Sequence, residues 1–194
     1  MTLRTQFWVL GILCGVLLVA QSCTRATLWE RHNAAGLTSY EQGYYGEAEE
    51  HWKAALKVAE NFGPQDPRLA TSLNNLAELY RAQGWSADAE LLYQRALAID
   101  EKALGSNHPD VATDLNNLAA LYQAQGRYAE AAPLHQRALA IWEKALGPQH
   151  PNVAQSLENY SALLRETGRD AEAGKLEARA KAIRAKYAQE NPVR

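Results

Sequence analysis

The chain contains very little cysteine and has no strong excess of either charge. Its 194 residues include two cysteines, Cys14 and Cys23, and both precede the repetitive region described below. No disulfide can therefore form within that region, so its stability must come from packing. There are 20 Lys and Arg residues against 22 Asp and Glu residues, for a formal net charge of −2. A nucleic-acid-binding module usually carries a basic stripe and a high pI, so we expect no nucleic-acid partner.

Recognisable catalytic and metal-binding motifs are missing from the sequence. It contains no glycine-rich phosphate loop, no serine nucleophile elbow and no Cys–His pair. His108 and His150 each precede a proline. Because a zinc site needs three or four converging ligands, we interpret these two as helix-capping and loop residues. The other histidines, His32, His51 and His135, are interpreted as packing or surface residues. We therefore expect no enzyme activity, no metal and no cofactor.

Only one long apolar run is present, close to the start of the chain. Phe7 to Ala20 is an unbroken run of 14 apolar or glycine residues. A membrane-spanning helix needs about 20 such residues, whereas the apolar part of a secretory signal has about 7–15. We interpret residues 1–22 as a signal peptide or membrane-targeting segment. An uncleaved membrane anchor and a simple cleaved signal remain alternatives.

The residues after this run suggest a lipid anchor. Ser22–Cys23 resembles a bacterial lipobox, in which a small residue precedes the cysteine that becomes the lipidated N-terminus. The resemblance implies lipidation of Cys23, with residues 23–27 as the lipidation site and a short tether. It also implies a membrane-anchored protein of the bacterial cell envelope, with its repeats on the periplasmic side. Thr24 in place of an aspartate favours the outer membrane. The alternative is that Cys23 is an incidental thiol near a membrane helix.

A phrase of 12 residues occurs twice in the chain. LNNLAELYRAQG at residues 73–84 returns as LNNLAALYQAQG at residues 115–126, a step of 42 residues. Pro67, Pro109 and Pro151 follow the same step. A weaker copy lies around Leu157–Gly168, and another precedes the first. Repeated units of this length stack on their neighbours and build an extended surface. We place the units at about residues 28–63, 66–105, 108–147 and 150–188, with residues 189–194 as a tail.

Each unit predicts two helices. Leu73, Leu76, Ala77 and Tyr80 stand at i, i+3, i+4 and i+7, which is one face of an α-helix. Gly84 then marks its end, and the repeated prolines suit first helical positions. A second apolar stripe of the same period follows in each unit. Pro133 falls inside the second helix of the third unit, near enough to its start to be tolerated.

These offsets of leucine, alanine and aromatic residues resemble the tetratricopeptide repeat. The 42-residue step, the LNNLA phrase and the junction EKALG-x-x-HP are similar to the kinesin light chain subtype. The resemblance covers about residues 28–188. It implies an all-α fold, a right-handed superhelical solenoid of about four helix-turn-helix repeats. It also implies a peptide or protein partner, bound in a concave groove lined by the first helix of each unit.

The resemblance places candidate groove residues on the first helices. Asparagines among them can both donate and accept hydrogen bonds, so they could hold the backbone of an extended peptide. The arginines could pair with acidic groups of such a ligand. Alternatively, the asparagines only fix the packing between first helices; we expect Asn74 and Asn116 to favour solvent or a ligand. The candidates are Leu37, Tyr40, Asn74, Asn75, Glu78, Arg81, Asn116, Asn117, Gln123, Glu158, Asn159 and Arg165.

The sequence therefore predicts a non-catalytic adaptor or scaffold, anchored to the cell envelope, that binds a peptide or protein. The main alternative is a self-associating solenoid whose terminal caps or convex face form the partner surface, giving a homodimer. A more remote alternative is an enzyme subunit or cofactor carrier.

Overall fold

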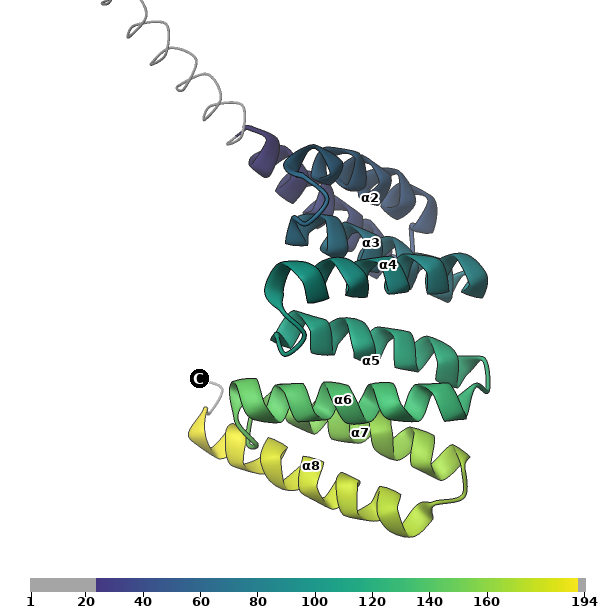
Figure 1. Ribbon diagram of the computed structural model, residues 1–194, viewed down its shortest axis with the longest axis vertical. Helices are drawn as coiled ribbons and strands as arrows, with labels where there is room; N and C mark the ends of the chain where they lie inside the picture. Colours follow the sequence, from purple (N-terminus) through teal and green to yellow (C-terminus); the bar gives the residue numbers. More distant parts are fainter. Residues whose placement is uncertain (1–23, 192–194) are drawn as a thin grey trace, which may run out of the picture. The chain divides into compact units, whose positions relative to one another are not determined.

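The computed structural model describes residues 24–191, and Figure 1 shows its elements. Every regular element in this part of the chain is a helix, which confirms the predicted all-α fold. The chain divides into two compact units, Met1–Gly63 and Pro64–Arg194. The predicted targeting segment and the proposed lipid site at Cys23 lie outside the described residues. Between residues 24 and 191, no helix is both long and apolar enough to cross a membrane.

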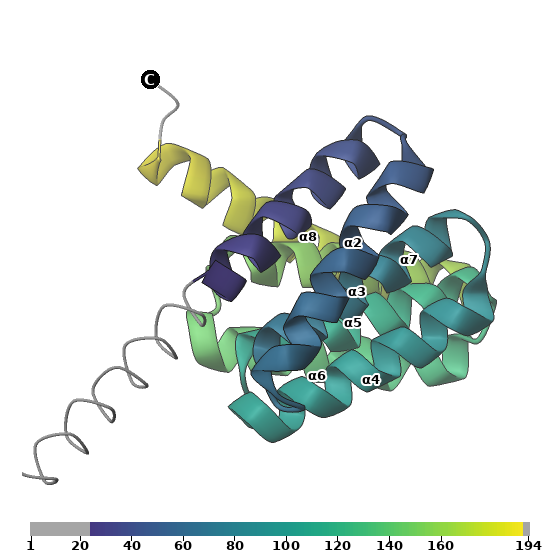
Figure 2. The same cartoon turned by 90° about the horizontal axis from the view of Figure 1, so that it is seen from above.

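The first unit contributes one pair of helices. Residues 24–41 are helical, α2 (Tyr45–Ala59) follows, and the 3-10 helix η1 (Glu60–Phe62) ends the unit. Figure 2 shows the helix of residues 24–41 beside α2. Residues 24–27, which we expected to form a short tether, are part of the first of these helices.

A glycine lets the two helices of this unit approach closely. Trp52 of α2 is 2% exposed, and its Nε1 donates a hydrogen bond to the backbone oxygen of Asn33 over 3.3 Å. A Cβ atom added at Gly36 would lie 2.5 Å from the indole ring. Any larger residue at this position would force the helices apart, because two nonbonded carbon atoms need about 3.5–4 Å.

The second unit consists of three successive helix pairs. They are α3 (Pro67–Ala82) with α4 (Ser86–Leu104), α5 (Pro109–Ala124) with α6 (Tyr128–Leu146), and α7 (Pro151–Glu166) with α8 (Asp170–Glu190). Within the unit, α4 also packs on α5, and α6 on α7 (Figure 1). The first helices α3, α5 and α7 contact one another in the same order. Each pair therefore covers the apolar side of the next, as stacked repeats require.

The first helices of this unit all begin in the same way. Each starts at a proline, and the residue before it caps the helix with its side chain. Asp66 Oδ1 accepts from the Arg68 N–H over 3.0 Å. In the two later repeats a histidine Nδ1 performs this function, accepting over 3.2 Å at His108 and 3.1 Å at His150. The interpretation of these two histidines as capping residues is confirmed.

The turn within each pair also repeats. Gly84 and Gly126 have φ angles of 81° and 74°, which a side chain would disfavour. The residue after each glycine donates its backbone N–H to the carbonyl oxygen five residues earlier, that of Tyr80 or Tyr122, over 2.8 Å. This is the hydrogen bond of a Schellman motif. The helices therefore end where the repeated glycines predicted. Helix α6 also continues through Pro133, as expected.

Two apolar clusters form the core of the second unit. One includes Tyr93, Leu118 and Tyr160, and the other includes Leu115 and Trp142. Fully buried alanines separate the larger side chains at both clusters. Trp142 is 5% exposed, and its ring completes the second cluster.

Candidate functional site

Two pockets open between successive first helices of the second unit. We call the surface formed by α3, α5 and α7 the first-helix face. One pocket lies between α3 and α5 and is lined by three aspartates, so we name it the acidic pocket. The other lies between α5 and α7, has a histidine of α6 in its lining, and is named the histidine pocket. Both are on the face that the sequence assigned to the groove.

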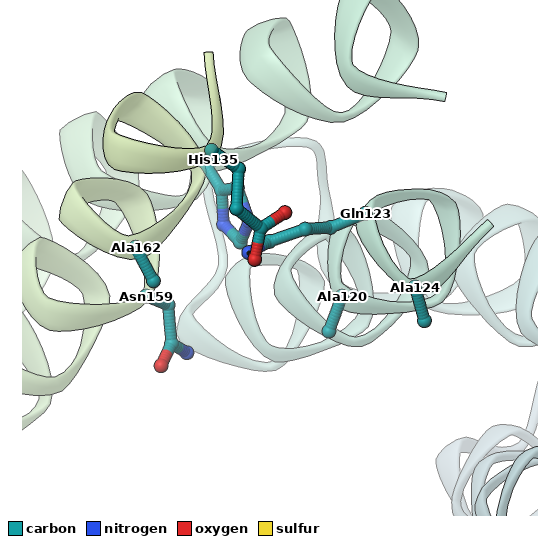
Figure 3. Close-up of a pocket in the computed structure, with 7 residues that line it drawn as sticks. Ala120, Gln123, Ala124, His135, Asn159 and Ala162 are labelled. Atoms are coloured by element: carbon teal, nitrogen blue, oxygen red, sulfur yellow. Dashed lines mark hydrogen bonds between the residues drawn. The ribbon is translucent and has the colours of Figure 1, made fainter. Parts of the chain in front are cut away.

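The histidine pocket has a volume of about 310 Å³. Figure 3 shows Ala120, Gln123 and Ala124 on one helix and Asn159 and Ala162 on another, with His135 between the two groups. Across the pocket, the side-chain amide of Gln123 donates to Glu166 Oε1 over 2.9 Å. This bond links α5 to α7 across the pocket.

The histidine in this pocket is fully buried, with 0% exposure. Its Nδ1 lies 3.1 Å from Asn116 Oδ1, so Nδ1 carries the proton and donates. Its Nε2 is then an acceptor, and no described residue donates to it. Burial lowers the pKa of His135 to about 4, because the charged ring would lose its hydration. The ring is thus neutral near pH 7 and offers one unused acceptor at the pocket.

The histidine pocket exists because the repeats differ at two positions. In the preceding repeat, the hydroxyl of Tyr93 donates to Glu78 Oε2 over 2.9 Å. One repeat later, 42 residues on, the same positions hold His135 and Ala120. The shorter side chains leave open the space that the Tyr93–Glu78 pair fills.

The acidic pocket has a volume of about 210 Å³. Asp100 of α4 and Asp114 of α5 are 4% and 1% exposed. The side-chain amide of Asn74 on α3 donates to Asp114 Oδ1 over 2.5 Å. The complete lining is Pro67, Thr71, Asn74, Asn75, Asp100, Asp110, Thr113, Asp114 and Asn117.

The two buried carboxyls in this pocket hold protons more tightly than an exposed aspartate. Burial is the largest cause, and it raises the pKa of Asp100 to about 6 and that of Asp114 to about 7. The charge of Asp110 raises both values further. Each carboxyl also affects the pKa of the other, so the two titrate as a pair.

Several of the candidate groove residues line these pockets. Asn74, Asn75 and Asn117 line the acidic pocket, and Gln123 and Asn159 line the histidine pocket. The side-chain amide of Asn117 makes no hydrogen bond to any residue between 24 and 191 and is half-buried.

Two asparagines expected to favour solvent or a ligand are engaged inside the protein. Asn74 binds Asp114 on the next first helix, and Asn116 binds His135 on α6. The packing alternative therefore applies to both. The acceptor oxygen of Asn74 nevertheless stays without a donor among the described residues.

The charged candidates pair with each other or with neighbouring helices. Arg81 lies 2.6 Å from Glu78. Arg165 lies 2.7 Å from Glu177, and Arg184 binds Glu158 over 2.6 Å. A ligand carboxylate would have to compete with these internal partners for Arg81 and Arg165.

Leu37 and Tyr40 belong to the first unit and line neither pocket. Leu37 is 50% exposed. The ring of Tyr40 lies 5.4 Å from that of Trp52 and 5.5 Å from that of Tyr45, so it packs within its own unit.

The sequence did not predict that aspartates line the acidic pocket, or that His135 lines the histidine pocket. A signal for one of them was present: Asp114 stands where the neighbouring repeats have Ser72 and Ser156. A charged residue that replaces a small one in an otherwise matching phrase marks a local specialisation. Among the described residues, no cluster of three or more His, Cys, Asp or Glu side chains is arranged to hold a metal ion.

The fold has many solved relatives. Bacterial BtubC (BKLC) from P. vanneervenii is 28% identical, with a TM-score of 0.76 over 88% of this chain and 68% of that one. A Podosopora anserina protein, described as a kinesin light chain with nearly identical TPR-like repeats, is 26% identical, with a TM-score of 0.65 over 85% of this chain and 77% of its own. Aspartyl phosphate phosphatase F from Bacillus subtilis shares the fold alone, at 18% identity and a TM-score of 0.74 over 84% of this chain and 42% of that one.

Comparison with curated protein sequences gives no match. The family model of the tetratricopeptide repeat, however, matches residues 24–102, 87–141 and 110–186. These overlapping matches extend over nearly all of the described residues and include all three helix pairs of the second unit. The chain therefore belongs to the tetratricopeptide repeat family.

Proposed function

We propose that this protein is a non-catalytic adaptor that binds an extended segment of a partner protein on its first-helix face. Tetratricopeptide proteins generally bind protein partners. The observation that carries the proposal is the alignment of both pockets on this one face, between three successive first helices. A segment lying across α3, α5 and α7 would pass over both.

The polar lining suits a peptide backbone. Asn75 and Asn117 occupy equivalent positions 42 residues apart, and Asn159 is the next in the series. All three line a pocket. A carboxamide donates and accepts at once, which matches the alternating N–H and C=O groups of an extended chain. The unengaged amide of Asn117 is available to a ligand at no cost to the fold.

We also propose that the adaptor is held at the bacterial cell envelope by a lipid on Cys23. The apolar run Phe7–Ala20 and the following Ser22–Cys23 support this. More than one acyl chain would give stable attachment, since each buried CH₂ contributes about 0.8 kcal/mol. Mass analysis of the native N-terminus tests it: a chain that begins with a diacylated or triacylated Cys23 supports the anchor, and an unmodified Met1 contradicts it.

Site-specific photo-crosslinking tests the binding face. A photoreactive residue is placed at Asn117 or Asn159 on the first-helix face, and at Lys102 or Lys144 on the second helices α4 and α6. All four side chains are at least partly exposed. In intact cells, we expect one partner band from the two asparagine positions and none from the two lysine positions.

Crosslinks confined to the lysine positions would move the interface to the second helices. Equal crosslinking at all four would show no preferred face and would contradict the proposal. Light scattering on the full chain identifies self-association, since a dimer crosslinked through Lys102 or Lys144 would support the self-assembling alternative instead.

A further inference from the structure

Three buried oxygen atoms at the acidic pocket have no hydrogen-bond donor among residues 24–191. They are Oδ1 of Asp100, Oδ2 of Asp114 and Oδ1 of Asn74. Buried polar atoms nearly always have a partner, because an unpaired one keeps its full desolvation cost. All three atoms are acceptors, so while both carboxyls are ionised they cannot satisfy one another. No donor among the described residues reaches these three atoms, and the lining of the pocket contains no Lys or Arg.

The two buried carboxylates also have no basic partner. Neither forms a salt bridge within the part of the chain that the structure describes. Asp110 adds a third carboxylate, with 61% of its side chain exposed, and its salt-bridge partner is His108 at 3.5 Å. Elsewhere on this face, Glu78 forms a salt bridge with Arg81 and Glu158 forms one with Arg184.

The fold does not require these acids. The backbone positions of the acidic pocket recur one repeat later, where different residues occupy them. A buried serine, Ser156, stands in place of Asp114, and Ser72 does so one repeat earlier; both are fully buried. The tryptophan Trp142 takes the place of Asp100. The carboxylates are thus a feature of this one junction, and burying them costs stability.

We infer that the acidic pocket receives the guanidinium group of an arginine side chain from the bound segment, an inference that rests on the proposed function. A guanidinium carries a positive charge and five N–H donors, whereas an ammonium has three. Asp100, Asp114 and Asn74 supply the three acceptors without donors, and Asp110 lies at the exposed side. A cavity of 210 Å³ is several times the volume of a water molecule and can hold such a group.

A proton is the natural competitor for this site. Without a cation, Asp100 and Asp114 satisfy each other by sharing one proton, which their raised pKa values of about 6 and 7 favour. The other titratable groups that act on the pair are Asp110 and His108, and α3 contributes the uncharged Asn74. A guanidinium would replace that proton, so it would bind more tightly as the pH rises from 5.5 to 8.

The test uses a pair of single-residue probes of similar size and shape, in which a neutral urea group with three N–H donors and a carbonyl oxygen replaces the charged guanidinium with its five donors. N-acetyl-arginine methylamide is titrated against the full 194-residue chain at pH 8, with its neutral citrulline counterpart as the matched probe. The side-chain amide signals of Asn74 and Asn117 in NMR spectra report occupation of the pocket. We expect the arginine probe to bind at least tenfold more tightly than the citrulline probe, and at least fivefold more weakly at pH 5.5 than at pH 8.

Two variants complete the design. Asp114→Asn keeps the size of the side chain and supplies the missing donor to Asp100, so we expect it to fold and to lose the tenfold preference. Asp88→Asn removes an exposed charge at the start of α4 and should leave the preference intact. Equal affinities of the two probes at pH 8, or an unchanged preference in Asp114→Asn, would overturn the inference.

The probe titration and the crosslinking experiment can fail independently of each other. The probes occupy only one pocket, so their failure leaves the crosslinking result at Asn117 and Asn159 unaffected. Conversely, charge-selective binding of the arginine probe without crosslinking on the first-helix face would identify a cation pocket in a protein whose partner binds elsewhere.

Discussion

Gly36 lies directly against the indole of Trp52, with no room for a methyl group between them. In the next repeat, 41 residues later, the equivalent residues are Ala77 and Tyr93. The larger ring, that of Trp52, thus faces the smaller residue, Gly36, whereas the smaller ring of Tyr93 faces Ala77. The two positions compensate for each other within one helix pair.

We expect Gly36→Ala to lower the free energy of unfolding by about 1–3 kcal/mol, because the added carbon overlaps the buried ring. The double variant Gly36→Ala/Trp52→Tyr should recover most of that loss, since it recreates the Ala77–Tyr93 combination. Urea unfolding of both single variants and the double variant measures the coupling. Strictly additive effects would show that the two positions do not compensate.

Asp114→Asn should stabilise the protein at pH 8 by about 1–3 kcal/mol and give no gain near pH 4. The pKa values of Asp100 and Asp114, about 6 and 7, lie above the usual value of 3.8. Between about pH 4 and 7 the folded state therefore binds more protons than the unfolded state, so the stability of the wild-type protein falls as the pH rises. Urea unfolding from pH 4 to 8 measures this difference, and a variant as pH-dependent as the wild type would contradict it.

The stability contributed by His135 should have the opposite pH dependence. Burial lowers its pKa from 6.5 to about 4, so between these values the unfolded state binds the extra proton. Stability is lost as the pH falls through this window, by about 3 kcal/mol in all. His135→Tyr, which installs the residue found at Tyr93, should remove that loss. Thermal unfolding of both proteins at pH 4.5 and 7.5 provides the comparison.

Replacing His150, the N-cap residue of α7, should show how much the cap contributes to stability. His150→Asp reproduces the cap that Asp66 forms, and it adds a negative charge where the helix dipole favours one. We expect a gain of about 0.5–1 kcal/mol. His150→Ala should instead cost about 1 kcal/mol, because the Asn152 N–H loses its acceptor. Urea midpoints that rank the alanine variant above the aspartate variant would show that the cap contributes nothing.

The helix pairs could be predicted from the sequence because their signals are local. The apolar stripe of Leu73 and Leu76, the proline at the helix start and the glycine at its end each act within a few residues. The 42-residue step then extended one well-marked repeat to its neighbours. These features fix which residues face the core, whatever the rest of the chain does.

The pockets could not be predicted in this way, because they depend on which side chains meet across helices. Asp100 and Asp114 belong to different repeats, and no periodicity shows that both are buried at one junction. Similarly, the sequence suggested that Arg81 and Arg165 were ready to bind acidic groups of a ligand. Their partners Glu78 and Glu177 are on the same helix and on the following one, and these pairings depend on side-chain geometry that the repeat does not encode.

The difference between Tyr93 with Glu78 and His135 with Ala120 also means that the first-helix face can be changed one repeat at a time. Splicing a second copy of residues 108–149 in front of His150 would set Asn117 and Ala120 of the new copy where Asn159 and Ala162 now stand. Glu166 would be replaced by Ala124, and the amide of Gln123 would lose its acceptor across the hollow. Duplication of one 42-residue repeat would thus lengthen the array. In the same event it would create a pocket that the Gln123–Glu166 hydrogen bond no longer spans.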